Sequence, residues 1–417
     1  MTSTAYRAAA IGPPVAVRQP ADRLVNAFLY LTILISPAVY IEPAPYEGAF
    51  ALLAVVCIAA KITVDRLFAP LIVLLAAWNV GGLLSLTQAS HSQDAVTFVA
   101  VSIYLSVSAI LFACLFSHDV DRRLGILRSA YIAAAVIVAS IGIAAYFKLI
   151  PGAEIFVMDG ARIRGTFKDP NVLGPFLVLP ILLLVMDLLQ RRFSVWRIAA
   201  MATLLFALLM SFSRGAWLNF AISGAVMTGL LFLTAPSPKI RLRLVAMAAI
   251  ALLLLASLVA AALSIGAVGN MFTERARVTQ DYDVGDGGRF TNQVRAIPLI
   301  LDHPNGVGPY QLRHYIGIDP HQVYLNAFAS YGWLGGISYI ALILSTLAVG
   351  FRYVLVRTSW QPYLVASYAA FLGMAIEGFV IDTDHWRHFY LVLGLVWGLS
   401  AATRNALNAH LRAARPR

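Results

Sequence analysis

Charged residues are scarce in this sequence. Asp, Glu, Lys and Arg make up 12% of its 417 residues, whereas an average soluble domain has about 25%. Cysteine is rarer still, because only Cys57 and Cys114 are present and both lie inside apolar runs. The lack of charge excludes a soluble enzyme with a water-facing surface, a disordered regulator and a nucleic-acid-binding protein. The number and setting of the cysteines argue against a disulfide framework and a cysteine metal site.

Apolar residues take the place of the missing charge. They make up 60% of the chain, and the mean hydropathy is +0.78. Apolar runs fall near residues 24–41, 48–64, 67–87, 95–117, 124–147, 172–189, 195–211, 216–234, 243–267, 325–351, 361–381 and 389–403. In lipid, backbone polar groups must be satisfied within each segment, so these runs are expected to be helices. The sequence therefore predicts an all-α polytopic membrane protein with about twelve transmembrane helices, forming a single membrane domain over residues 1–417.

The distribution of charge predicts the orientation. With both termini placed in the cytoplasm, the inside segments hold most of the Lys and Arg residues and few acids, while acids outnumber basic residues outside. The positive-inside rule therefore predicts cytoplasmic termini and an even number of spans. The run at 24–41 has no clear cleavage site after it and is interpreted as an uncleaved first helix.

Two of the predicted outer segments are long, residues 148–171 and 268–320. The second lies between the ninth and tenth predicted helices and contains a short amphipathic helix from about 289 to 302. Within it, Asp281 and Asp283 have the spacing of an Asp-x-Asp metal motif, but a solvated Asp/Gly loop is favoured and no metal site is expected. Loops of this size in a compact bundle are usually functional, which places the chemistry on the outer face.

Several predicted outer cations suit an anionic ligand. Arg214 lies in a short turn with Ser213 and Gly215, where the start of a helix would add backbone N–H donors. Guanidinium groups bind phosphates in a bidentate manner, so Arg214 is the leading candidate for an anion-binding residue. For other outer arginines such as Arg313, the alternative is contact with lipid headgroups or pairing with acids.

His321 is the candidate general base. Asp319 and Pro320 precede it and predict a helix start, with His321 in the first helical turn. A helix N-terminus and nearby arginines favour the neutral imidazole, which can accept a proton. The alternative is an interfacial histidine without a role.

The segment 377–388 is dense in charged and aromatic residues and joins the last two predicted helices on the outer side. Asp384, Trp386 and Arg387 are expected to line an acceptor entrance there, with Trp386 as a stacking platform for a sugar. An interfacial belt that anchors the helix ends is an equally good interpretation. Glu377, one turn inside the apolar run, is a further functional candidate.

Five short motifs resemble the O-antigen ligase and polymerase superfamily of membrane glycosyltransferases. They are Gly165–Gly174, Ser211–Trp217, Gly306–Gly308, His321–Leu325 and Tyr331–Gly335. Their order and spacing, and the large loop before the last three predicted helices, resemble the family over roughly residues 95–400. Gln322 departs from the pattern, because family members often carry Asn after the histidine.

The resemblance implies a GT-C-like, metal-independent and cofactor-free enzyme of lipopolysaccharide biosynthesis in the bacterial inner membrane. Such an enzyme moves a glycan from undecaprenyl diphosphate to a lipid A–core or similar acceptor on the periplasmic face, with inversion. By the same resemblance His321 is the base, Arg214 and Arg289 contact the diphosphate, and Arg164 is a helper. Acceptor-binding or supporting roles are expected for further residues in or near the motifs and outer segments: Lys168, Asp169, Asn171, Arg313, Tyr324, Asp384, Trp386 and Arg387.

Two other functions remain open at this level. A polymerase of polysaccharide repeat units would use the same donor on the same face. A transporter or flippase for lipids or solutes would need ionisable residues near the middle of the membrane. The apolar runs hold few of these, with Asp187 near a predicted inner end and Glu377 near an outer end, which disfavours a conducting path.

Overall fold

The structure is a computed structural model that describes residues 21–41, 44–89, 92–159, 162–190, 194–264, 266, 269, 288–317 and 321–413. It is almost entirely helical, as the sequence predicts. Each of the twelve apolar runs contains a helix: α2 (Ala21–Leu34), α3 (Pro45–Ala59), α4 (Ala69–Ser85), α5 (Gln93–Phe116), α6 (Val120–Tyr146), α7 (Pro170–Gln190), α8 (Val195–Met210), α9 (Arg214–Thr234), α10 (Pro238–Ser264), α14 (Val323–Val354), α15 (Gln361–Glu377) and α16 (Arg387–Ala413).

Six helical segments among the described residues are long and apolar enough to cross a membrane. They are residues 66–88, which include α4, and the helices α5, α6, α7, α9 and α14. The helices α3 and α8 are apolar but shorter. The all-α membrane architecture is therefore supported, and the number of twelve spans stays a prediction.

Short elements connect the long helices. Three are 3-10 helices, η1 (Arg66–Phe68), η2 (Leu86–Gln88) and η3 (Ala153–Phe156), and two are strands, β1 (Val157–Met158) and β2 (Arg162–Ile163), paired antiparallel. Helix α12 (Arg289–Asp302) lies where the short amphipathic helix is predicted, and α13 (Leu312–Ile316) follows it. Asp281 and Asp283, for which a solvated loop and no metal site is predicted, lie outside the described residues.

The long helices pack closely where small residues remove side-chain bulk. A Cβ atom built on Gly81 of α4 would lie 2.7 Å from the backbone nitrogen of Gly335 in α14. A Cβ atom on Gly398 of α16 would lie 2.6 Å from the carbonyl oxygen of Ala113 in α5. Without side chains at these crossings, backbones approach directly, as is common between membrane helices. These contacts fix α14 against α4 and α16 against α5.

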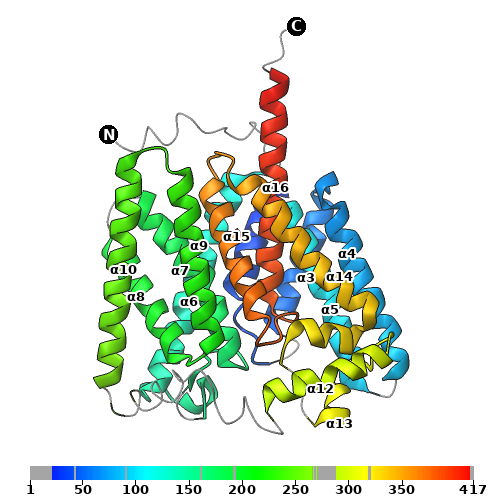
Figure 1. Cartoon of the computed structure of the whole chain (residues 1–417). Coiled ribbons are helices and arrows are strands. Elements are labelled where there is room, and N and C mark those ends of the chain that lie inside the picture. The colour runs from blue at the N-terminus through cyan, green and yellow to red at the C-terminus, as the bar shows by residue number, and fades with distance from the viewer. Residues whose placement is uncertain are drawn as a thin grey trace.

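The bundle has two ends that differ in character. At one end, here called the α12 end, lie α12, α13 and the link between α15 and α16 (Figure 1). At the opposite end, here called the α16 end, the last part of α16 extends beyond the other helices (Figure 1), and most of its side chains there are exposed. The motif residues at the starts of α7 and α9 lie next to one another and next to Glu377 at the end of α15.

Candidate functional site

Helix α9 starts with a capped first turn that contains Arg214. Ser213 caps the helix, because its hydroxyl accepts a hydrogen bond from the Ala216 amide at 3.3 Å. Arg214 is the first residue of α9 and is partly buried. The exposed N–H groups of a first helical turn and the positive end of the helix dipole both favour a negative ligand. The predicted setting of Arg214 at a helix start therefore agrees with its place in the structure.

The segment before α7 is tied to this turn by a buried arginine. The Arg162 guanidinium donates to the Ser211 carbonyl at 3.0 Å and to the Asn171 side-chain oxygen at 2.9 Å. Asp169 accepts a hydrogen bond from the Asn171 amide at 2.7 Å and so shapes the start of α7. Asp169 and Asn171 thus hold the loop in position. From the sequence, Arg162 is one of several basic residues predicted on the outer side. No feature of the sequence indicates that its side chain is buried.

Arg164 and Lys168 contribute to the same loop. Arg164 donates to the carbonyl oxygens of Ile155 at 3.1 Å and Lys168 at 3.3 Å, and its guanidinium lies 5.4 Å from the centre of the Tyr40 ring. The Lys168 side chain is exposed. Two guanidinium nitrogens of Arg164 thus bind the loop, and the helper role of Arg164 at a diphosphate stays a prediction.

His321 lies just outside a helix and not in its first turn as predicted. Helix α14 begins at Val323 with Gln322 as its N-cap, and His321 has a φ of 46°. Positive φ is uncommon for residues with a side chain, although His tolerates it better than most. The Val323 amide donates to the Gly378 carbonyl at 3.0 Å, so this start of α14 is fixed to the end of α15.

Asp382 forms an ion-pair contact with His321. The Nδ1 atom of His321 lies 3.7 Å from Oδ2 of Asp382, and the His321 side chain is 48% exposed. The side-chain amide of Asn326 donates to Oδ1 of Asp382 at 3.3 Å, and the Ser330 hydroxyl donates to Asn326 at 2.9 Å. At this distance the contact is electrostatic and longer than a hydrogen bond, and a carboxylate so close favours a positive charge on the imidazole. The sequence prediction selects Asp384 and misses Asp382, which lies two residues earlier.

Tyr324, a predicted supporting residue, joins α14 to α15. Its hydroxyl donates to the Ala375 carbonyl at 2.5 Å, and its ring lies 4.6 Å from that of Phe379. These contacts hold the start of α14 in place, next to His321.

Glu377 connects the two halves of the site. Its side chain is 1% exposed, and Oε2 accepts a hydrogen bond from Asn219 of α9 at 2.7 Å. A Cβ atom on Gly215 would lie 3.0 Å from Oε1 of Glu377, so the first turn of α9 packs directly on this carboxyl group. Arg214 and His321 therefore flank the same end of α15, one through Gly215 and Glu377, the other through Val323 and Gly378.

Asp384 and His385 form a second acid–histidine pair with a different character. Nδ1 of His385 lies 3.0 Å from Asp384, and Nε2 donates to the Phe98 carbonyl at 3.0 Å. Burial lowers the pKa of His385, but the Asp384 carboxylate and the Phe98 carbonyl outweigh it and raise the pKa above its usual range. With both ring nitrogens facing acceptors, His385 is suited to a fixed positive charge and not to accepting a proton.

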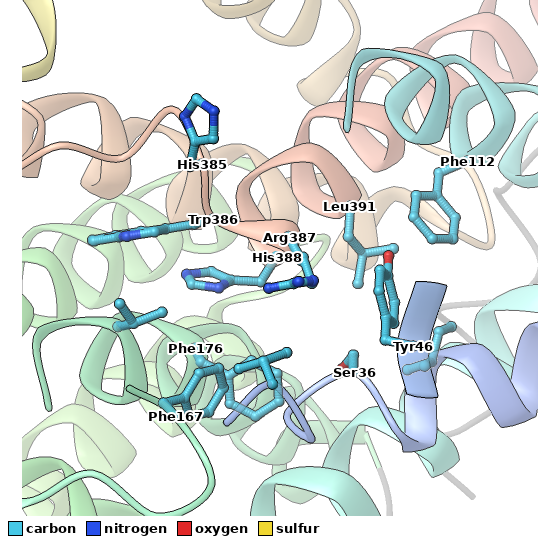
Figure 2. Close-up of a pocket in the computed structure, with 13 residues that line it drawn as sticks. Ser36, Tyr46, Phe112, Phe167, Phe176, His385, Trp386, Arg387, His388 and Leu391 are labelled. Atoms are coloured by element: carbon cyan, nitrogen blue, oxygen red, sulfur yellow. The ribbon is translucent and has the colours of Figure 1, made fainter. Parts of the chain in front are cut away.

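Trp386 and Arg387, which are predicted to line an acceptor entrance, both have largely buried side chains. Trp386 is only 6% exposed and stacks on His388, with 5.2 Å between ring centres, and Arg387 is paired with Glu47. Figure 2 shows Trp386, Arg387 and His388 at the wall of a pocket whose volume is about 40 Å³. The stacking role of Trp386 stays a prediction, and the ring lies largely buried at this pocket.

Two further predicted cations belong to α12 and α13. Arg289 is the first residue of α12, and its side chain lies outside the described residues. Arg313 is exposed on α13, and its guanidinium lies 5.2 Å from the centre of the Tyr310 ring, which in turn packs on Phe98. Arg313 is thus connected to His385 through the rings of Tyr310 and Phe98. Within the described part of the chain, no group of three or more His, Cys, Asp or Glu side chains could hold a metal ion.

Comparison with protein families gives a match for part of the chain. The model of the O-Antigen ligase family matches residues 198–340, a segment that includes α9, α12, α13 and the first part of α14. No curated protein matches the chain. The matched segment contains Arg214, Arg289 and His321, and it confirms the resemblance seen in the motifs. Residues 198–340, about a third of the chain, are therefore similar to the O-antigen ligase family.

Proposed function

We propose that this protein is a glycosyltransferase that moves a glycan from undecaprenyl diphosphate to a hydroxyl group of lipid A–core or a similar acceptor. In this proposal the α12 end faces the periplasm and both termini lie in the cytoplasm of a bacterium, in its inner membrane. The observation that carries the proposal is the Asp382–His321 pair, held by Asn326 and placed at the same end of α15 as the Arg214 helix start.

The chemistry follows from the positions of these groups. With Nδ1 of His321 directed at Asp382, Nε2 is assigned to take the proton of the acceptor hydroxyl. The acceptor oxygen bonds to the anomeric carbon as the bond from that carbon to the diphosphate oxygen breaks. Attack opposite the leaving group inverts the anomeric centre.

The departing diphosphate needs fixed positive charge. Arg214 and the first turn of α9 supply it, with Arg289 as the second guanidinium, because preorganised donors and charges stabilise the leaving anion. The diphosphate is a good leaving group, so the scheme needs neither a general acid nor a metal ion.

The test is glycan transfer by purified protein, with release of undecaprenyl diphosphate measured in parallel. His321→Ala is expected to lower the rate constant by about 10²–10⁴-fold, the usual contribution of a general base. His303→Ala is the matched control, because His303 bonds the Leu299 carbonyl at the end of α12 and has no part in the scheme. Full activity of His321→Ala would show that His321 is not the general base.

The superfamily match also supports a polymerase of polysaccharide repeat units. The two functions share the donor and differ in the acceptor. Purified protein offered either lipid A–core or carrier-linked repeat units will extend the acceptor that it uses. A protein that moved the donor across the bilayer without releasing undecaprenyl diphosphate would instead be a flippase.

A further inference from the structure

Helix α12 has an apolar face that is not buried in the protein core and has no part in the proposed chemistry. Its buried face carries Ala296 and Ile300, which pack with Val307, Leu312 and Ala329. A separate set of large apolar side chains points away from the protein, namely Phe290 at 45% exposed, Val294 at 66%, Ile297 at 46% and Leu301 at 59%. Contiguous apolar residues exposed in this way usually mark an interaction surface.

The spacing of these four residues places them in one stripe. They follow one another at intervals of four, three and four positions, which on a helix with 3.6 residues per turn gives a stripe roughly 60° wide. The polar residues Thr291, Arg295 and Asp302 lie on the other side of the buried face. Helix α12 therefore presents one flank to an apolar medium and the opposite flank to water.

The stripe continues onto a helix that qualifies as a membrane span. Next to Leu301, the Ile300 carbonyl accepts a hydrogen bond from the Trp333 indole of α14 at 2.9 Å. Trp333 is 41% exposed, and its neighbours Leu334 and Ile337 are 44% and 59% exposed. Helix α14 meets the length and hydropathy expected of a membrane span, so its exposed apolar side chains face lipid, and Trp is typical of the boundary between lipid and water.

We propose that α12 lies in the plane of the membrane surface at the α12 end, with its Phe290–Leu301 stripe among the lipid acyl chains. The partner is the bilayer itself, and the Thr291, Arg295 and Asp302 flank faces water. A helix with separate apolar and polar flanks is stabilised at such an interface by burial of its apolar side chains. If the proposed function holds, this position keeps Arg289, the first residue of α12, at the level where a lipid-linked diphosphate lies.

The depth of α12 can be measured without any assay of activity. Nitroxide labels are attached to Val294→Cys and Ile297→Cys in the apolar stripe, and to Arg295→Cys on the polar flank as the matched control. Cys57 and Cys114, both buried, are first replaced by alanine in the full-length chain. The variants are reconstituted in phosphatidylethanolamine–phosphatidylglycerol vesicles, and collisions with oxygen and with a water-soluble nickel chelate are recorded by electron paramagnetic resonance.

Labels at 294 and 297 are expected to collide mainly with oxygen, which concentrates in the acyl region, and the label at 295 mainly with the nickel chelate. Equal access of the chelate at all three positions would overturn the proposal. So would spin–spin broadening at 294 or 297 that disappears on dilution with unlabelled protein, because a second copy of the chain would then cover the stripe. Both results are independent of whether the protein transfers glycans.

Discussion

At the residue scale, two acid–histidine pairs whose acids lie two residues apart differ in burial and in hydrogen bonding. In the Asp382–His321 pair the imidazole is 48% exposed and its Nδ1 faces the carboxylate. In the Asp384–His385 pair the carboxylate is 5% exposed, and both ring nitrogens of the histidine face acceptors. The first arrangement suits proton transfer and the second suits a permanent charge. The exposure of the imidazole and the partners of its two nitrogens make the difference.

This contrast gives a matched pair of variants. Asp382→Asn keeps the size of the side chain but removes the charge that stabilises a protonated His321, so the rate constant of transfer should fall by about 10²–10⁴-fold. Asp384→Asn is the same chemical change two residues away, and it should lower the thermal midpoint of unfolding with little effect on transfer. Steady-state kinetics and thermal unfolding in detergent measure the two effects. Equal loss of activity in both variants would contradict separate roles.

At the element scale, the motif glycines serve close packing of helix starts. A Cβ atom on Gly174 of α7 would lie 2.4 Å from the Cβ of Ala216 in α9. Gly332 has a φ of 68° within α14, and a Cβ atom there would lie 2.6 Å from the Pro304 carbonyl oxygen. Gly174 therefore brings α7 against α9, and Gly332 brings α14 against the loop that follows α12. Their role is structural, and the proposed phosphate contacts belong to Arg214 and the start of α9.

The packing role of Gly174 can be tested against another helical glycine. Gly174→Ala forces α7 away from α9 and should destabilise the protein by about 1–3 kcal/mol, the usual cost of overpacking. Gly224→Ala in α9 meets nothing within 4 Å, so it should be neutral or stabilise by up to about 1 kcal/mol through helix propensity. Thermal unfolding of both variants in the same detergent decides the matter. A Gly174→Ala protein as stable as the parent would show that the two helices do not meet as described.

At the scale of the whole molecule, α16 joins the two ends of the bundle. At its start Arg387 pairs with Glu47 in the first turn of α3, and near its other end Arg404 pairs with Asp65, which follows α3. Asp65 also accepts hydrogen bonds from the Leu67 amide at 2.7 Å and the Asn405 side chain at 2.8 Å. The anchor lies toward the opposite end of the bundle from the proposed site (Figure 1), and it should influence stability without influencing the chemistry.

Low pH should weaken the contact between Asp65 and Arg404. Burial raises the pKa of the Asp65 carboxyl, but the Leu67 amide, Asn405 and Arg404 together lower it below its usual range. A lowered folded-state pKa means that the stabilisation is complete above the ordinary carboxyl value of about 4 and is lost as the pH falls through the lower folded-state value. Asp65→Asn should lower the thermal midpoint at neutral pH and flatten its decline in acid. Asp94→Asn, at an exposed position in the first turn of α5, is the control. It should leave the thermal midpoint at neutral pH and its decline in acid nearly unchanged.

The sequence by itself determined the helical architecture, since a long apolar run in lipid has no alternative to a helix. It also placed Arg214 at a helix start, through the local pattern of serine and glycine around it. It could not choose between Asp382 and Asp384, because an irregular link between two helices has no periodicity from which side-chain direction can be derived. Nor could it tell that Arg162 and Trp386 are buried.

Only the tertiary structure decided those points, because they depend on contacts between segments far apart in the chain. Asp382 meets His321 across about sixty residues, and Arg162 meets the Ser211 carbonyl across 49. Hydropathy reports the average environment of a segment and says nothing of which neighbour a given side chain finds. The few charges in this apolar chain acquire their roles only when the ends of α7, α9, α14 and α15 come together.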